Sequence, residues 1–183
     1  MPGCARTGGS VRVPEPSFLE SSGRARRDFS RDRSVLLPTI LVADSDAEYR
    51  AMARDALLEG GSPSDLRFVT DGQDLLDYLH RRGSHLDPVR SPRPALIVLD
   101  LRLPRLGGLE AVRSIKSNPD LRRIPVVALT DDVEAEAVAA AYDAGVSTYL
   151  AKPVTFLALV KLMKVFTAYW LDAAVLPPAE EAA

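Results

Sequence analysis

The chain has 183 residues, 46% of them hydrophobic, which is enough for about one domain with a sizeable core plus terminal segments. Its net charge of -2 gives no reason to expect a nucleic acid as partner, and its single cysteine excludes an intramolecular disulfide and a cysteine-rich zinc site. Because no apolar run approaches the ~20 residues of a membrane span and the N-terminus lacks the apolar core of a secretory signal, we expect a cytoplasmic protein without a membrane partner.

The first segment, residues 1–34, is predicted to be a disordered tail. It is rich in Gly, Ser, Pro and Arg and has neither helical nor strand periodicity. Its cluster of Arg24, Arg26 and Arg27 offers a patch for an anionic surface, but a solvated tail is the simpler interpretation. An over-long translation start is a further alternative. The ordered domain is expected over residues 35–170, followed by a C-terminal extension over residues 171–183.

Segments with strand-like and helix-like patterns alternate after the tail. Strands are predicted from short apolar runs, and helices from apolar residues spaced three and four apart. In chain order they are a strand over 40–43, a helix from 45 to 60, a strand over 66–69, a helix around 75–79, a strand over 95–99, a helix over 109–118, a strand over 126–129, a helix over 133–144, a strand over 148–151 and a helix from about 155 to 170.

Two helix starts carry additional signals. The Ser45-x-x-Glu48 spacing of a capping box places the start of the first helix at Ser45. Asp131, Asp132 and Glu134 are expected in the first turn of the fourth helix, where negative charges favour the positive helix end.

Other polar residues in the first half receive simpler interpretations. His80 and His85 have no partner at metal-ligand spacing, so we expect surface roles for both. Asp71-Gly72 is a turn dipeptide, and we do not assign it to a site.

Strands that alternate with helices imply right-handed crossovers and a parallel sheet. We therefore predict an α/β fold with a doubly wound five-stranded sheet of order 2-1-3-4-5. Polar residues end four of the apolar runs: Asp44 the first, Asp100 the third, Thr130 the fourth and Lys152 the fifth. Because those strands are neighbours in this order, their side chains should meet in one crevice at the carboxyl edge.

Two carboxylates, one hydroxyl and one ammonium form a coherent chemical set. Asp44 and Asp100 can hold Mg²⁺, which prefers oxygen ligands, while Thr130 and Lys152 can bind phosphoryl oxygens. One carboxylate must then be the nucleophile that forms an aspartyl phosphate. Asp100 is the better candidate because the longest buried strand places it at the centre of the sheet. Taken alone, it is equally well explained as a helix cap or a solvated loop acid.

From residue 36 to about 170 the chain resembles the receiver domain of two-component response regulators, which has a flavodoxin-like fold. The resemblance implies that Asp100 is the phosphoacceptor, loaded from the phosphohistidine of a histidine kinase. It also implies that Asp44 and the backbone carbonyl of Arg102 ligate the metal beside Asp100. The only reactions catalysed would be the chain's own phosphorylation and dephosphorylation.

The same resemblance assigns roles to the later strand ends. Thr130 would be the switch hydroxyl that moves toward the phosphoryl group, and Lys152 the charge that pairs with it. Tyr149 matches the switch aromatic that turns inward with the threonine. The Lys152-Pro153 bond would be cis, which an X-Pro bond permits at a cost of ~0.5 to 1 kcal/mol.

The C-terminal part, with residues 116–120 and 124–127, resembles single-domain regulators partnered with bacterial phytochrome kinases. This resemblance implies a light-sensing kinase as phosphodonor and a dimer through the last helix. Independently, the helix over 155–170 is too apolar for one buried face, because Leu157, Val165 and Tyr169 lie outside its main stripe. We expect a homodimer through this helix and the C-terminal extension; the alternative is a C-terminal tail that folds back over the stripe.

Two positions depart from the family pattern. Ala43 stands where receivers carry the first acid of a pair, so Mg²⁺ affinity is expected to fall. Arg102 is expected to pair with Asp131 or Asp132, or to add positive charge near the phosphoryl group, which would partly offset the lost acid and slow hydrolysis. One alternative is a degenerate receiver that acts as a phosphorylation-independent docking module. Another, an unrelated flavodoxin-like enzyme or nucleotide binder, is disfavoured because no glycine-rich loop follows the first strand.

Overall fold

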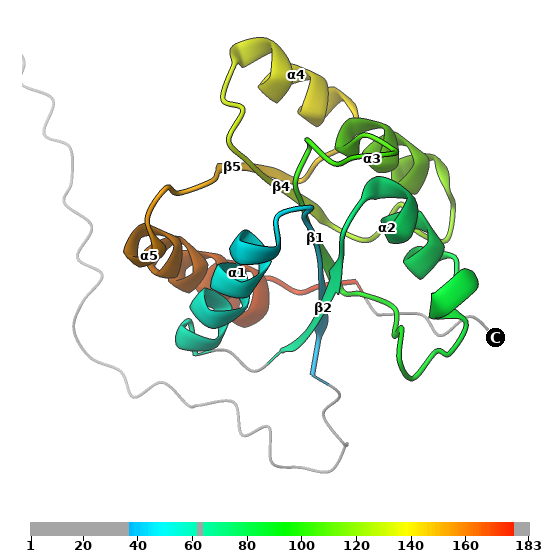
Figure 1. Cartoon of the computed structure of the whole chain (residues 1–183), viewed down its shortest axis with the longest axis horizontal. Coiled ribbons are helices and arrows are strands. Elements are labelled where there is room, and N and C mark those ends of the chain that lie inside the picture. The colour runs from blue at the N-terminus through cyan, green and yellow to red at the C-terminus, as the bar shows by residue number, and fades with distance from the viewer. Residues whose placement is uncertain (1–36, 62–63, 178–183) are drawn as a thin grey trace, which may run out of the picture. The chain divides into compact units, whose positions relative to one another are not determined.

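The computed structural model describes residues 37–61 and 64–177, and its strands form one parallel sheet (Figure 1). The predicted tail over residues 1–34 and the last residues of the C-terminal extension lie outside the described residues. The strands are β1 (Thr39–Ala43), β2 (Asp65–Val69), β3 (Leu96–Leu99), β4 (Val126–Thr130) and β5 (Thr148–Ala151). Their order, β2-β1-β3-β4-β5, confirms the predicted doubly wound sheet.

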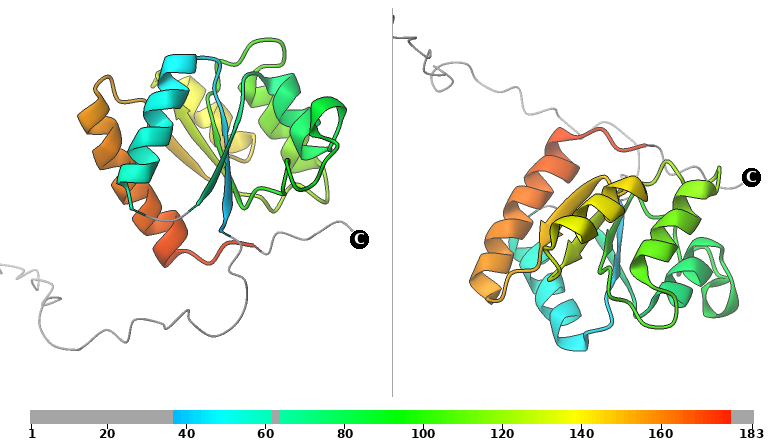
Figure 2. Two further views of the ribbon diagram at one scale, coloured as in Figure 1. Left: turned by 60° about the horizontal axis from the view of Figure 1, so that its bottom comes forward. Right: turned by 90° about the horizontal axis from the view of Figure 1, so that it is seen from above.

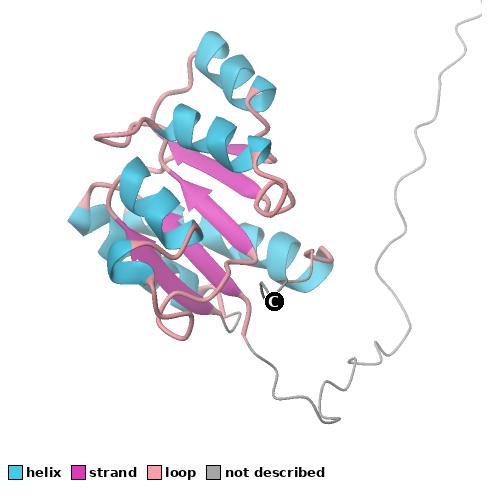
Figure 3. Ribbon diagram, turned by 90° about the vertical axis from the view of Figure 1, so that its right-hand side faces the viewer, coloured by secondary structure: helices cyan, strands magenta, loops and turns pink. Residues whose placement is uncertain are grey.

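Helices connect the strands and cover both faces of the sheet. They are α1 (Ala47–Glu59), α2 (Gly72–Leu79), α3 (Gly108–Ser117), α4 (Ala135–Asp143) and α5 (Phe156–Thr167), with a short 3-10 helix η1 (Gly83–His85) and a π-helical turn η2 (Ala168–Ala173). α1 and α5 pack side by side on one face, and α2, α3 and α4 cover the other (Figure 2, Figure 3). None of the described helices has the length and apolar character needed to cross a bilayer.

β3 contributes side chains to both hydrophobic cores. Ile97 and Leu99 belong to the core under α2, α3 and α4, whereas Leu96 and Val98 belong to the core under α1 and α5. Alternate residues of a parallel strand feed opposite faces, so all of these side chains are buried. Asp100 follows directly, at the end of a strand that is held by packing on both sides.

The N-cap of the first helix lies one residue later than predicted, and the helix itself begins at Ala47. The N-cap is Asp46, not Ser45, and its carboxylate accepts hydrogen bonds from the backbone N–H of Glu48 at 2.8 Å and of Tyr49 at 3.1 Å. A carboxylate accepts two amide hydrogens and also carries the charge that a helix N-terminus favours, so Asp46 is the better cap.

The acids before α4 lie outside the helix. α4 begins at Ala135 with Glu134 at the N-cap, so Asp131 and Asp132 belong to the preceding loop. The Asp132 carboxylate accepts from the Glu134 N–H at 3.1 Å and closes a local turn, which is the common alternative to helix for aspartate. The last helix also differs, because its α-helical part ends at Thr167 and continues as η2.

His85 is more enclosed than the sequence predicts. Its Nε2 lies 2.8 Å from Asp74 Oδ1, its Nδ1 lies 3.2 Å from Ser91 Oγ, and its ring contacts the ring of Tyr78. These contacts join α2 to the connection that leads into β3. Asp74 and Ser91 are not at metal-ligand spacing from His85 in the sequence. Only the folded chain brings the three side chains together.

Candidate functional site

Three of the four predicted strand-end side chains meet at the carboxyl edge of the sheet. The Lys152 ammonium lies 2.7 Å from Asp44 Oδ2 and 2.7 Å from Asp100 Oδ2. In the parallel β1–β3 pair Ala43 is the partner of Leu99, so the next residues along the two strands are neighbours. Lys152 reaches them from the end of β5, whose backbone continues the sheet.

The fourth residue, Thr130, ends β4 beside them. Its carbonyl accepts a hydrogen bond of 2.8 Å from the Lys152 N–H, which places both residues at the same edge. Its side chain is 0% exposed, and its hydroxyl has no hydrogen-bond partner among the described residues. An unpaired buried hydroxyl costs about 1 to 3 kcal/mol, so a ligand that accepts from it would recover that cost.

Both carboxylates are buried and fully engaged. Asp44 Oδ1 accepts from the Asp46 N–H at 2.9 Å, and Asp100 Oδ1 accepts from the Arg102 N–H at 3.0 Å. Their other oxygens share the Lys152 ammonium. Backbone donors and one ammonium therefore offset the cost of burying two carboxylates, while the three side chains keep a net charge of -1.

The site passes a simple test for a divalent cation. The two carboxylates already converge on one cationic group, and carboxylate and carbonyl oxygens are the donors that hard divalent ions prefer. A third acid is missing: among the described residues there is no group of three potential His, Cys, Asp or Glu ligands. Ala43, where the resemblance described above leads us to expect that acid, has a buried methyl group instead.

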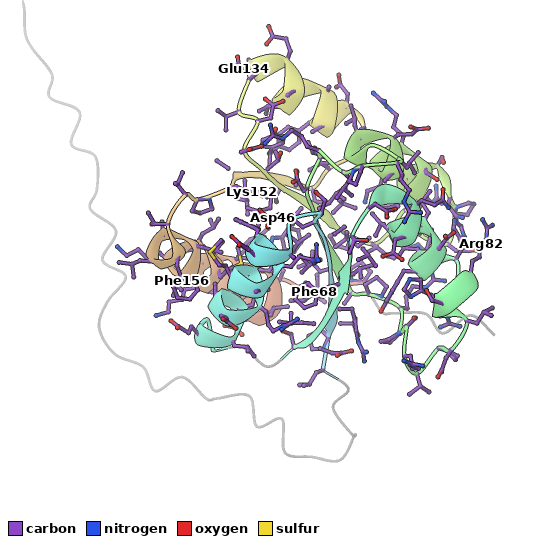
Figure 4. The ribbon with its side chains drawn as sticks, in the orientation of Figure 1. Asp46, Phe68, Arg82, Glu134, Lys152 and Phe156 are labelled. Carbon is purple, nitrogen blue, oxygen red and sulfur yellow. The ribbon has the colours of Figure 1, made fainter. Side chains whose placement is uncertain are left out.

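A pocket of about 410 Å³ opens onto Asp100 and Lys152. Its lining residues are Ser45, Asp46, Tyr49, Met52, Asp100, Arg102, Asp131, Lys152, Pro153 and Val154. Figure 4 labels two of these residues, Lys152 in the connection from β5 to α5 and Asp46 at the start of α1. At the pocket rim the Arg102 guanidinium forms an ion pair with Asp131, one of the two acids predicted as its partner. The ion pair links the β3–α3 loop to the β4–α4 loop.

Tyr149 lies on β5 near the same loop. Its ring packs against the core under α2, α3 and α4, and its hydroxyl donates a 2.5 Å hydrogen bond to the Asp132 carbonyl. Burial, and then the negative charges of Asp132 and Asp100, raise the pKa of the Tyr149 hydroxyl. The aromatic side chain is therefore tied to the β4–α4 loop.

The predicted cis peptide at Lys152-Pro153 is wrong. No peptide bond among the described residues is cis. The Lys152 side chain reaches both carboxylates with a trans bond, and trans is the favoured isomer of X-Pro bonds.

The loop after Asp100 is held at both ends. Gly108 packs so closely that a Cβ there would lie 2.5 Å from the Asp100 carbonyl oxygen and 2.5 Å from the Leu101 Cα. Further along the loop, the exposed Arg105 guanidinium forms an ion pair with the buried carboxylate of Asp71. That carboxylate also caps α2, so the turn aspartate that the sequence left outside any site anchors the loop.

Sequence reasoning missed Tyr49 as a member of the site. Tyr49 lies within the first predicted helix without an assigned role, and its ring is buried in the core shared with α5. The same ring lines the pocket, and the Lys152 ammonium lies over it, 4.4 Å from the ring centroid. An aromatic residue five positions after the strand-end acid Asp44 was the available signal.

The family of response regulator receiver domains matches residues 40–164. The chain belongs to this family. The receiver is 37% identical to response regulator Rcp1 of Synechocystis over 140 residues, which cover 76% of this chain and 92% of Rcp1.

Solved structures agree with the sequence match. A manganese-bound form of Rcp1 superposes on this receiver with a TM-score of 0.70 and 33% identity, covering 77% of this chain and 99% of that one. The phosphorylated cyanobacterial phytochrome response regulator RcpA gives 0.72 and 31% over 78% and 99% of the two chains. RPA3017, a regulator in red light signaling of R. palustris, gives 0.73 and 33% with the same coverage. The receiver is therefore similar to phytochrome response regulators.

Proposed function

We propose that this receiver accepts a phosphoryl group on Asp100 from the phosphohistidine of a histidine kinase. The observation that carries the proposal is the convergence of Asp100 and Asp44 on the Lys152 ammonium, at 2.7 Å each, beside a pocket that Asp100 and Lys152 line. A carboxylate oxygen of Asp100 attacks phosphorus as the bond from phosphorus to the histidine nitrogen breaks. The imidazole nitrogen keeps the electron pair of that bond and takes up a proton.

The remaining residues of the site would bind either the metal ion or the transferred phosphoryl group. Asp44, Asp100 and the Arg102 carbonyl would hold Mg²⁺, which supplies positive charge against the phosphoryl oxygens when bound. Lys152 would move from the carboxylates to a phosphoryl oxygen. The Thr130 hydroxyl, which has no hydrogen-bond partner in the described part of the chain, would donate to another phosphoryl oxygen, and Tyr149 would leave the Asp132 carbonyl to follow it.

A degenerate receiver that docks without phosphorylation is the second candidate, favoured by Ala43 and by the Arg102–Asp131 ion pair at the pocket rim. Beryllofluoride, which mimics a phosphoryl group on a carboxylate, separates the two. With Mg²⁺ present we expect bound fluorine resonances in ¹⁹F NMR of the wild type, and none for Asp100→Asn or without the metal. A wild type that gives no bound resonance at saturating Mg²⁺ would be a docking module.

The similarity to RcpA and RPA3017 supports a bacteriophytochrome kinase as the phosphodonor. We place the receiver in the cytoplasm, where such a kinase domain would meet it. Phosphotransfer from candidate kinases, compared under red and far-red light, tests the pairing.

We further propose a homodimer through α5 and the C-terminal extension. Leu157, Val165 and Tyr169 are exposed on α5 and η2, outside the face that packs against the sheet. Several large apolar side chains exposed along one continuous helical segment favour a partner surface. In this assignment Val165, at 68% exposure, lies in the contact.

Val165→Lys should therefore convert the dimer to a monomer in light scattering, because a buried unpaired ammonium is costly. The matched control is Val89→Lys, which alters a valine at 80% exposure in the connection between η1 and β3. It should leave the mass unchanged. A wild type that is monomeric at all concentrations, or equal masses for both variants, contradicts the dimer.

A further inference from the structure

Tyr49 is the only pocket-lining side chain among the described residues with an aromatic ring. The Lys152 ammonium lies 4.4 Å from the centre of that ring while it also lies 2.7 Å from Asp44 and 2.7 Å from Asp100. The Tyr49 ring on α1 and the two carboxylates that directly follow β1 and β3 thus hold the ammonium in one place.

We propose that the Tyr49 ring is a positioning residue that holds the Lys152 ammonium between Asp44 and Asp100 and thereby weakens divalent-metal binding. The inference rests on the proposed metal site and adds a residue that sets its affinity. It concerns the ring and not the hydroxyl.

The ring is suited to this task because it is buried. Tyr49 is 7% exposed, and the face of an aromatic ring attracts a cation most strongly when water is excluded. Burial and the charges of Asp44 and Asp100 raise the pKa of its hydroxyl, which therefore stays neutral and is no anionic ligand. The hydroxyl has no hydrogen-bond partner among the described residues, so the described contact with Lys152 is made by the ring alone.

The ammonium and a divalent cation compete for the same carboxylates. Like charges at contact distance repel strongly in a buried site, so a metal ion can bind both acids only after Lys152 has left them. Every interaction that favours the ammonium in this position lowers the apparent metal affinity by the same free energy. The Tyr49 ring is the third group in contact with the ammonium besides Asp44 and Asp100, so its removal should shift the competition toward the metal ion.

The test is a titration of the full chain with Mn²⁺. Binding is measured by calorimetry and by the electron paramagnetic resonance signal of the free ion. Tyr49→Leu removes the ring but keeps an apolar side chain, and we expect it to bind Mn²⁺ about five- to thirtyfold more tightly. Tyr49→Phe keeps the ring and should retain the affinity of the wild type. Tyr49→Met, a flexible side chain that fills irregular space, serves as a second ring-free variant if the leucine variant folds poorly.

A double-mutant cycle shows whether the effect passes through the lysine. In Lys152→Met no ammonium competes, so Mn²⁺ should bind more tightly and Tyr49→Leu should then add nothing. Unchanged or weaker binding in the ring-free variants, or a gain that persists without Lys152, overturns the inference while the metal site stands. If neither the wild type nor Lys152→Met binds Mn²⁺, the metal site itself is wrong and the inference falls with it.

Discussion

Asp100→Asn should abolish base-labile phosphorylation of the receiver by acetyl phosphate and by a cognate histidine kinase. The amide lacks the nucleophilic carboxylate oxygen, so we expect a loss of at least about 100-fold, a low estimate for removal of a nucleophile. The variant should remain folded, because Lys152 keeps Asp44 as its partner at 2.7 Å. Radiolabel incorporation and intact-protein mass spectrometry measure the effect.

The matched control is Asp143→Asn, at an exposed aspartate on α4 outside the pocket. It should be labelled like the wild type. Persistent labelling of Asp100→Asn would move the phosphoacceptor to another residue, and Asp44 would be the first to examine. Equal loss in both variants would indicate that labelling reports general integrity of the fold and not one carboxylate.

Gly108→Ala should destabilise the receiver by about 3 kcal/mol, the upper part of the range for overpacking a filled site. A Cβ at this position would lie 2.5 Å from the Asp100 carbonyl oxygen and 2.5 Å from the Leu101 Cα, which are backbone atoms that no side-chain rotation can move. The loop that carries the Arg102 carbonyl would have to shift. Urea unfolding with a shared slope gives the change in the free energy of unfolding.

Gly107→Ala provides a neighbouring control. Its Cβ would meet nothing within 4 Å, and its φ of -59° is one that alanine adopts readily. We expect a change of no more than about 0.5 kcal/mol, as for most surface substitutions. Equal effects at the two glycines would mean that the close approach of α3 to the end of β3 is not the reason why position 108 needs a glycine.

The alternation of apolar runs was sufficient to predict a parallel sheet and the edge where the polar residues meet, whereas the strand order came from the known doubly wound topology. In a parallel sheet every strand points the same way, so residues that directly follow the strands Ile40–Ala43 and Leu96–Leu99 must share an edge. That argument uses only period and polarity, which the sequence displays directly. The sequence-based helix starts were less accurate, because Ser45 and Asp46 are both good caps and differ by which one reaches the free N–H groups.

The sequence by itself therefore determined the doubly wound sheet and the meeting of Asp44, Asp100 and Lys152, since burial and strand direction admit few other arrangements. Only the tertiary structure decided that the Arg102 guanidinium pairs with Asp131 and not Asp132, that Asp71 anchors the loop through Arg105, and that the Tyr49 ring carries the Lys152 ammonium. Each of these depends on a choice among several partners of similar chemistry. Side-chain rotamers and the packing of neighbouring elements decide which partner lies within reach, and the spacing of residues in the sequence does not reveal this.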